Sequence, residues 1–197
     1  MFNHFKDLIS QYTSIDETTW RFIEPKLYRT CYKKGETLLY SGDVCQKIIF
    51  INSGISRMYY FNEHGKEFTC HISYGDAGEN IIDRFAVDYN SFMTQNPSVY
   101  TIEALQDMDV IEIFFEDSAV LSSQIDIFHQ MDTKINQLIH AEKSDILIEM
   151  NTTSTSERYK AFKQRFKPIY TKIPQYIIAS YLGITPVALS RLKNKQS

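Results

Sequence analysis

The last 46 residues of the chain carry the side chains best suited to binding a polyanion. Nine of the 21 Lys and Arg residues lie between positions 152 and 197, together with a single one of the 24 Asp and Glu residues, so this segment has a net charge of +8. The preceding residues hold a net charge of −11. A polyanion such as nucleic acid is attracted to the first segment and repelled by the second, so its binding would be oriented. The charge split therefore predicts two parts with different partners.

The end of the basic segment has the pattern of two short helices joined by a tight turn. Pro174 begins the first helix, and Gly183 supplies the turn, where a left-handed backbone costs glycine least. Thr185 is a good N-cap for the second helix, with Pro186 at its first position. The residues expected to face inward are Ile178, Ala179 and Leu182, and then Ile184, Val187 or Ala188, and Leu192. The pattern predicts a helix-turn-helix, which enters a DNA major groove, and an ordinary pair of antiparallel helices is the alternative.

The acidic part of the chain has short β-rich runs separated by turn residues about every ten positions. The expected strands are Thr37–Tyr40, Ile48–Ile51, Ile55–Phe61, Phe68–Ile72, Val99–Leu105 and Asp109–Phe115. Runs of this length and spacing predict an antiparallel sandwich or barrel. The segment Glu79–Pro97 has a mixed pattern, which indicates a helix with a loop.

A long amphipathic helix is expected between the two parts, from Ser118 or Asp126 to about Met150, where the chain has neither Gly nor Pro. A helix of roughly 25 residues spans about 37 Å, which is more than a small β-domain can cover, so one apolar stripe is left for another chain. The polar residues 151–156 then break the pattern and predict a hinge, with Thr155 or Ser156 opening the next helix.

Four short motifs occur in a fixed order in the acidic part: Gly35–Asp43, Ile49–Gly54, Asn62–Glu67 and Tyr74–Asp76. Followed by L-G-I-T-x-x-x-L-S-R near the C-terminal end, they resemble the Crp/Fnr transcription regulators over almost the whole chain. The resemblance implies an α+β fold with an N-terminal antiparallel β jelly roll of the cyclic-nucleotide-binding type at 1–117. A connecting dimerisation helix at 118–151 and an all-α helix-turn-helix domain at 152–197 would follow. Family members usually continue into a β-hairpin wing, and this sequence predicts none.

The same resemblance implies roles for residues of the second helix. Arg191 falls where the family places an arginine that reads guanine through two hydrogen bonds. Pro186 and Val187 stand where polar readers are common, so readout there would be limited to contacts such as those with a thymine methyl. The expected phosphate contacts are Thr185, Ser190, Lys193, Lys195 and Lys172.

In the family that the sequence resembles, the connecting helix pairs with its copy. The interface residues are then expected to be Phe128, Met131, Ile135, Leu138, Ile139 and Ile146. The homodimer would bind a pseudo-palindromic site on double-stranded DNA, and RNA polymerase would be a further partner.

At the ligand-binding positions of the family, this sequence departs from the family's pattern. In the family, a short helix flanked by Gly-Glu and Arg holds a cyclic nucleotide, and the arginine pairs with the cyclic phosphate. Alignment through Ala104 places Val87 and Asp88 at the Gly-Glu positions and Ser98 at the arginine position. A buried phosphate without a cation is costly, so we expect that cyclic AMP is not a tight ligand. The residues expected around the vestigial pocket are Asp88, Ser91, Ser98 and Glu142, with solvated loop positions or local caps as the alternative.

The composition suggests no cofactor and no metal. The three cysteines, Cys31, Cys45 and Cys70, lack C-x-x-C spacing and are too few for an iron-sulfur cluster. His71 lies on an expected strand, and His129 and His140 lie on one helix face, but no metal-binding histidine motif occurs. Without a catalytic motif, a secretory signal or an apolar run of about 20 residues, we expect a cytoplasmic protein that is not an enzyme and has no membrane contact.

Two other functions fit parts of the sequence. A cupin-like enzyme or another small-molecule-binding protein with a basic tail would need a metal triad of histidines and a carboxylate, and only His71 lies on an expected strand. A cyclic-nucleotide receptor that acts on a protein partner is disfavoured by Ser98 at the arginine position. The sequence therefore favours a Crp/Fnr-type transcription regulator.

Overall fold

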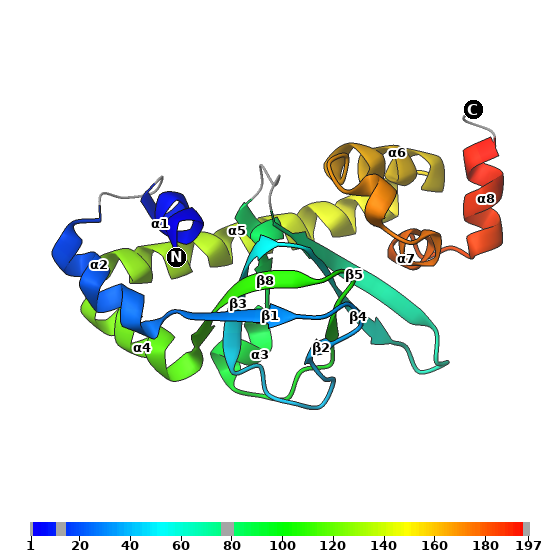
Figure 1. Cartoon of the computed structure of the whole chain (residues 1–197). Coiled ribbons are helices and arrows are strands. Elements are labelled where there is room, and N and C mark those ends of the chain that lie inside the picture. Colours follow the sequence, from blue (N-terminus) through cyan, green and yellow to red (C-terminus); the bar gives the residue numbers. More distant parts are fainter. Residues whose placement is uncertain (1, 11–14, 76–80, 195–197) are drawn as a thin grey trace.

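The chain forms two β-sheets flanked by N-terminal helices at one end and by C-terminal helices at the other (Figure 1). The computed structural model describes residues 2–10, 15–75 and 81–194, some of them in helices by their backbone alone. The strands are β1 (Tyr28–Tyr32), β2 (Thr37–Leu39), β3 (Lys47–Ser53), β4 (Ile55–Phe61), β5 (Glu67–Tyr74), β6 (Phe85–Ala86), β7 (Thr101–Ala104) and β8 (Met108–Phe114). The helices are α1 (Asn3–Ser10), α2 (Glu17–Ile23), α3 (Tyr89–Thr94), α4 (Phe115–Gln124), α5 (Asp126–Thr152), α6 (Thr155–Arg165), α7 (Gln175–Tyr181) and α8 (Pro186–Asn194), with 3-10 turns at Glu24–Lys26, Ile81–Arg84 and Tyr170–Lys172.

The strands pair into two four-stranded antiparallel sheets. Their orders are β1-β8-β3-β6 and β2-β7-β4-β5. Side chains from both sheets, among them Ile49, Ile102 and Val110, meet in one apolar cluster between them. This arrangement confirms the predicted antiparallel β-sandwich. The strands β1 and β6 were not among the expected strands, and β6 has two residues, which are too few to show an alternating pattern.

The outer face of the β1-β8-β3-β6 sheet is covered by helices that precede the strands in sequence and by helices that follow them. Phe5 of α1, Trp20 of α2 and Leu121 of α4 join Phe50 and Ile111 of the sheet in one apolar cluster. The rings of Phe5 and Phe50 meet edge to face, with centroids 5.3 Å apart. The N-terminal helices therefore belong to the β-domain and leave the other sheet free to contact other elements.

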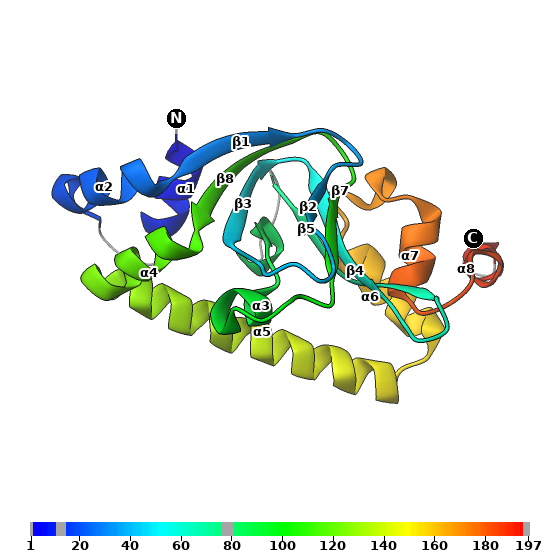
Figure 2. The same cartoon turned by 90° about the horizontal axis from the view of Figure 1, so that it is seen from below.

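Of the two expected starts of the long helix, Asp126 is confirmed, and the residues from Ser118 onward belong to a separate helix, α4. The backbone is extended at Ile125, with φ −130° and ψ 102°, and this residue separates α4 from α5. The helix α5 has 27 residues and is therefore about 40 Å long. Figure 2 shows it running along one side of the sheets from α4 to α6. Within the described ranges, no helix combines the length and the apolar character that crossing a bilayer requires.

The C-terminal helices begin after a two-residue break at Thr153 and Ser154. Ser154 caps α6, since its hydroxyl accepts a hydrogen bond from the Glu157 amide while the Glu157 carboxylate accepts one from the Ser154 amide. The helices α6, α7 and α8 surround an apolar cluster that also contains Ile72 and Tyr74 of β5. The C-terminal helices therefore share one core with the β2-β7-β4-β5 sheet.

Candidate nucleic-acid interface

The turn between α7 and α8 ends one helix and starts the next within four residues. Gly183 has a φ of +71°, in the left-handed region that glycine adopts without steric cost. The Ile184 amide donates to the Ala179 carbonyl at 3.0 Å, a bond of the Schellman motif. The Thr185 hydroxyl accepts a hydrogen bond from the Ala188 amide at 3.2 Å and so caps α8. The predicted roles of Gly183 as the turn and Thr185 as the N-cap are confirmed.

The helix α8 turns a narrow apolar edge toward α7 and the rest of its surface toward solvent. Leu189 is 1% exposed and anchors the helix. Ile184 and Leu192 pack against the same cluster and are partly buried. The expectation that Val187 or Ala188 faces the core is wrong, because Val187 is 61% exposed and Ala188 is exposed. Residues three apart share a helix face, so Leu189 and Leu192 define the buried edge and Val187 lies opposite.

The outer side of α8 and its N-cap carry most of the predicted contact residues. Those that are exposed are Thr185, Pro186, Val187, Ser190 and Arg191. Lys193 is partly buried and donates a hydrogen bond to the Gln175 side-chain oxygen at 2.5 Å. Lys195 lies outside the described residues, and Lys172 is exposed. One short helix therefore offers a guanidinium, hydroxyl groups and a branched apolar side chain on a single accessible side.

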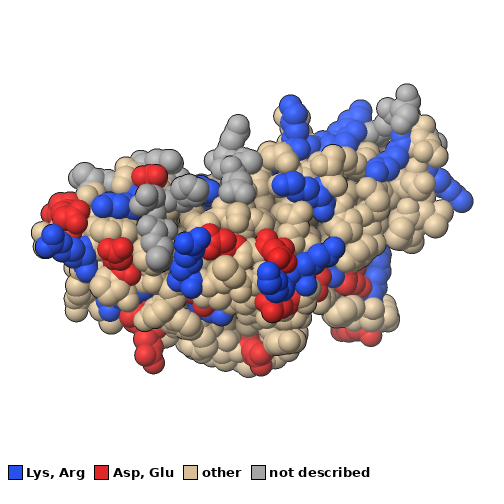
Figure 3. Space-filling model, viewed as in Figure 1, with Lys and Arg blue, Asp and Glu red and all other residues tan. Residues whose placement is uncertain are grey.

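Lys and Arg side chains gather over α6 and α8 at one end of the molecule (Figure 3). Lys160 lies on α6 and Lys167 lies just past its end, and both are exposed. Lys163 lies between them, 4.8 Å from the Tyr159 ring centroid. The sequence predictions counted these lysines in the charge of the segment but not as contacts. The step of three residues from Lys160 to Lys163 was the signal that places these two on one helix face.

The helix α7 is held on strand β5 by hydrogen bonds as well as by apolar contacts. The Ser180 hydroxyl accepts a hydrogen bond from the Thr69 amide at 2.8 Å and lies 3.3 Å from the Glu67 carbonyl, to which it donates. The Lys66 ammonium donates to the Gly183 carbonyl at 3.1 Å. The β4-β5 hairpin therefore fixes both α7 and the turn that precedes α8.

The residues at the expected ligand positions form a closed hydrogen-bond network. The Ser98 hydroxyl donates to the Asp88 carboxylate at 2.7 Å, and Asp88 caps α3 by accepting from the Ser91 amide at 3.4 Å. The Ser91 hydroxyl donates to the Asn96 carbonyl at 2.5 Å and accepts from the Cys45 amide at 2.9 Å. Asp88, Ser91 and Ser98 are buried, so they hold the α3 loop in place as local caps. The structure describes Glu142 by its backbone alone.

The apolar side chains of α5 divide between the chain's own core and solvent. Phe128 is buried in the cluster that covers the β1-β8-β3-β6 sheet, so it faces its own chain and not a partner as expected. Ile148, near the other end of α5, is 60% exposed. The expected interface residues that are partly exposed are Leu138, Ile139 and Ile146. The structure describes Met131, Ile135 and His140 by their backbone alone.

Of the three histidines considered from the sequence, the structure describes the side chains of His71 and His129. His71 on β5 is partly buried, and its Nε2 lies 4.0 Å from the Asp83 carboxylate. His129 on α5 is exposed. Within residues 2–10, 15–75 and 81–194, no three His, Cys, Asp or Glu side chains come together as a metal-binding group.

Comparison with known families gives one match. The family described as the cyclic nucleotide-binding domain matches residues 29–125. This range begins in β1 and ends at the break between α4 and α5, so it covers both sheets. No curated protein matches the chain.

Solved structures resemble the chain over most of its length. FixK2 from Bradyrhizobium japonicum has a TM-score of 0.71 at 12% identity, covering 86% of this chain and 83% of that one. A putative transcriptional regulator of the Crp/Fnr family from Eubacterium rectale has a TM-score of 0.71 at 18% identity, covering 92% and 83%. The catabolite activator protein of Thermus thermophilus has a TM-score of 0.57 at 14% identity, covering 93% and 84%. Residues 29–125 thus match the cyclic nucleotide-binding domain, and the chain has the fold of the Crp/Fnr transcription regulators.

Proposed function

We propose that the protein is a homodimeric transcription regulator of the Crp/Fnr type that binds double-stranded DNA through α8. The observation that carries this proposal is the accessible outer side of α8, which Leu189 anchors from beneath and which offers Val187, Ser190 and Arg191. A single helix fits the major groove of B-DNA, which is about 12 Å wide. The positive charge around α8 supports the same partner, because phosphate contacts supply most of the non-specific affinity for DNA.

Within the groove, Arg191 would read a guanine and Val187 would contact a thymine methyl. Thr185 and Ser190 would bind phosphates, together with Lys195 and with Lys193 once its ammonium leaves Gln175. Pro186 would limit readout at its position to apolar contact. Lys160 and Lys167 extend the positive surface beyond α8 and would add contacts to the DNA backbone.

The homodimer would form through α5. Its length of about 40 Å exceeds what α4 and the sheets cover, and Ile148 remains mostly exposed on the monomer. We keep Leu138, Ile139, Ile146, Met131 and Ile135 as interface residues and leave out Phe128. Two copies would present their α8 helices one DNA turn apart on a pseudo-palindromic site. The protein would act in the cytoplasm, with RNA polymerase as a further partner.

Regulation would change the angle between the two α8 helices through the break at Thr153 and Ser154. Such a movement must separate α7 from β5, including the bond between Ser180 and Thr69. Cyclic AMP is an unsuitable trigger, because Ser98 donates to Asp88 where the family would offer a cation to the phosphate. Calorimetric titration with cyclic AMP should show no binding at micromolar concentrations, and micromolar affinity would refute this part of the proposal.

The test of the proposed function is selection of bound fragments from random duplex DNA at two salt concentrations. We expect a pseudo-palindromic consensus that persists at the higher salt, whereas non-specific binding weakens steeply with salt. Gel filtration at micromolar concentration should show a dimer. Failure to retain any duplex at low salt, or equal retention of all sequences at both concentrations, would contradict the proposal.

A further inference from the structure

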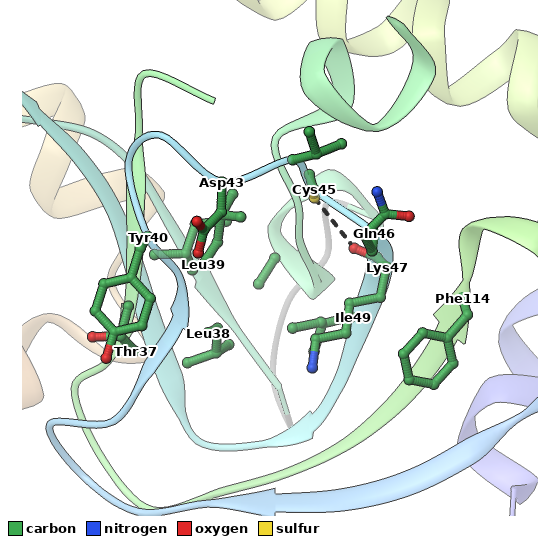
Figure 4. A pocket seen from close by; sticks show the side chains of 13 residues that line it. Thr37, Leu38, Leu39, Tyr40, Asp43, Cys45, Gln46, Lys47, Ile49 and Phe114 are labelled. Atoms are coloured by element: carbon green, nitrogen blue, oxygen red, sulfur yellow. Dashed lines mark hydrogen bonds between the residues drawn. The ribbon is translucent and has the colours of Figure 1, made fainter. Parts of the chain in front are cut away.

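A pocket of about 200 Å³ opens between the two sheets (Figure 4). Its wall comes from β2, the loop that follows β2, and parts of β3, β6, β7 and β8. The apolar lining residues include Leu38, Leu39, Ile49, Ile102 and Phe114. Asp88, Ser91 and Ser98 are not among its lining residues, so this pocket is separate from the positions at which the family holds a cyclic nucleotide.

Lys47 places an ammonium group inside this apolar space. Figure 4 shows its side chain extending past Ile49 into the space between Leu38 and Phe114. The ammonium donates to the Glu112 carboxylate at 2.7 Å and to the Tyr32 hydroxyl at 2.7 Å, its two acceptors among the described residues. A lysine ammonium carries three donors. One N–H of Lys47 is therefore available to an acceptor that enters the pocket.

The charge of Lys47 is already balanced within the protein. Glu112 is buried, with a side chain that is 5% exposed. Burial lowers the pKa of Lys47, but the hydrogen bonds to Glu112 and Tyr32 and the charge of Glu112 outweigh it, so the pKa lies above its usual value. Lys47 is therefore a protonated donor at neutral pH. An anionic ligand would bring a second negative charge close to the buried Glu112 carboxylate, so a neutral acceptor fits better.

We propose that this pocket binds a small neutral molecule with an apolar ring and one carbonyl acceptor, which takes the third N–H of Lys47. A dry cavity of about 150 Å³ lined by Leu, Ile and Phe accommodates benzene, so the present volume suits one ring with a short substituent. Leu38, Ile102 and Phe114 bury the ring, and Lys47 fixes its orientation. Aromatic ketones and aldehydes meet both conditions.

The test compares three probes of similar size by methyl NMR titration of the full chain. Acetophenone offers a neutral carbonyl, ethylbenzene lacks the acceptor, and benzoate carries a negative charge. We expect acetophenone to shift the methyl signals of Leu38, Leu39, Ile49 and Ile102. It should bind about fivefold or more tightly than either other probe, the effect of one hydrogen bond in an apolar site. Equal affinity for all three probes, or shifts confined to other methyl groups, would overturn the proposal.

Variants separate the role of Lys47 from that of the pocket. The double change Lys47→Met and Glu112→Gln removes both charges, so it leaves no unpaired ion, and it should abolish the preference for acetophenone over ethylbenzene. Thr37→Phe, at the pocket wall, should weaken all three probes about tenfold by filling space. Lys33→Met, which removes an exposed lysine paired with Asp107, is the matched control and should change nothing. Retention of the preference in the double variant, or unchanged binding in Thr37→Phe, would refute the assignment.

Discussion

The Arg165 guanidinium donates a hydrogen bond to the Asp83 carboxylate at 2.7 Å, and this bond joins the end of α6 to the turn before β6. The Asp83 side chain is 2% exposed, whereas that of Arg165 is 26% exposed. His71, whose Nε2 is 4.0 Å from the Asp83 carboxylate, approaches it from β5. The C-terminal helices are therefore tied to the β-domain by a largely buried ion pair as well as by the apolar cluster.

We expect Arg165→Met to lower the free energy of unfolding by about 3 kcal/mol, because it leaves the buried Asp83 carboxylate without its main cation. The double variant with Asp83→Leu should recover most of that loss, since a neutral pair carries no uncompensated charge. Urea denaturation monitored by circular dichroism would measure the free energy of unfolding of both variants. A single variant as stable as the parent would show that the pair contributes little.

A second prediction concerns Phe166, which is fully buried in the cluster shared by α6, α7 and β5. Phe166→Ala should destabilise the protein by about 3 to 5 kcal/mol, because it removes a large buried ring and leaves a cavity. Since the cluster spans both parts, signals from β5 and from α7 should be lost at the same urea concentration. Two separate transitions in the parent protein would contradict a shared core.

The capping box of α6 gives an expectation on pH. The hydrogen bonds from the Ser154 hydroxyl and amide lower the pKa of Glu157 below its usual value. A carboxylate with a lowered folded-state pKa contributes stability above its unfolded pKa and loses it as pH falls through the folded value. NMR titration of the Glu157 carboxyl carbon should show this lowered pKa, and Ser154→Ala should return it toward the ordinary value. An unchanged pKa in Ser154→Ala would exclude the cap as its cause.

The two kinds of proposed DNA contact should respond differently to truncation. Arg191→Ala should cost about 1 to 3 kcal/mol of binding and relax specificity at one base pair. Lys160→Ala should weaken binding alike on all sequences and reduce its salt dependence, because a phosphate contact carries no sequence information. Binding of the selected site and a scrambled site at two salt concentrations would separate the two effects. Equal effects of both changes on both sequences would reject the role of Arg191.

Regular elements were predictable from the sequence where the local pattern is strong. The strand β4 coincides with the predicted Ile55–Phe61, because its aromatic residues favour a strand and the turn residues Gly54 and Asn62 flank it. Thr185 and Gly183 were predictable because caps and turns depend on the residue's own chemistry. The sequence left the start of the long helix open between Ser118 and Asp126, since the isoleucine at position 125 carries no local signal of a break.

The candidate site was predictable in its residues but not in its packing. The exposed side of α8 includes Arg191, Ser190 and Thr185 as expected, whereas the sequence could not tell whether Val187 or Leu189 faced inward, since both are apolar. The sequence named Asp88 and Ser98, but the bond between them depends on how the α3 loop folds back. Contacts between residues far apart in sequence, such as Ser180 with Thr69, cannot be inferred from the local sequence pattern.

The cluster of β4, β5 and the C-terminal helices limits how freely the two halves of this chain can be recombined with those of other proteins. Ile55, Ile72 and Tyr74 lie on the sheet face that α6 and α7 cover. A chimera that keeps this β-domain but takes the C-terminal helices of another protein of this fold would leave that face exposed unless the donor supplied matching side chains. Exposed apolar surface of that kind promotes aggregation, so grafts should be designed at this boundary as a single repacked unit and not spliced at the linker.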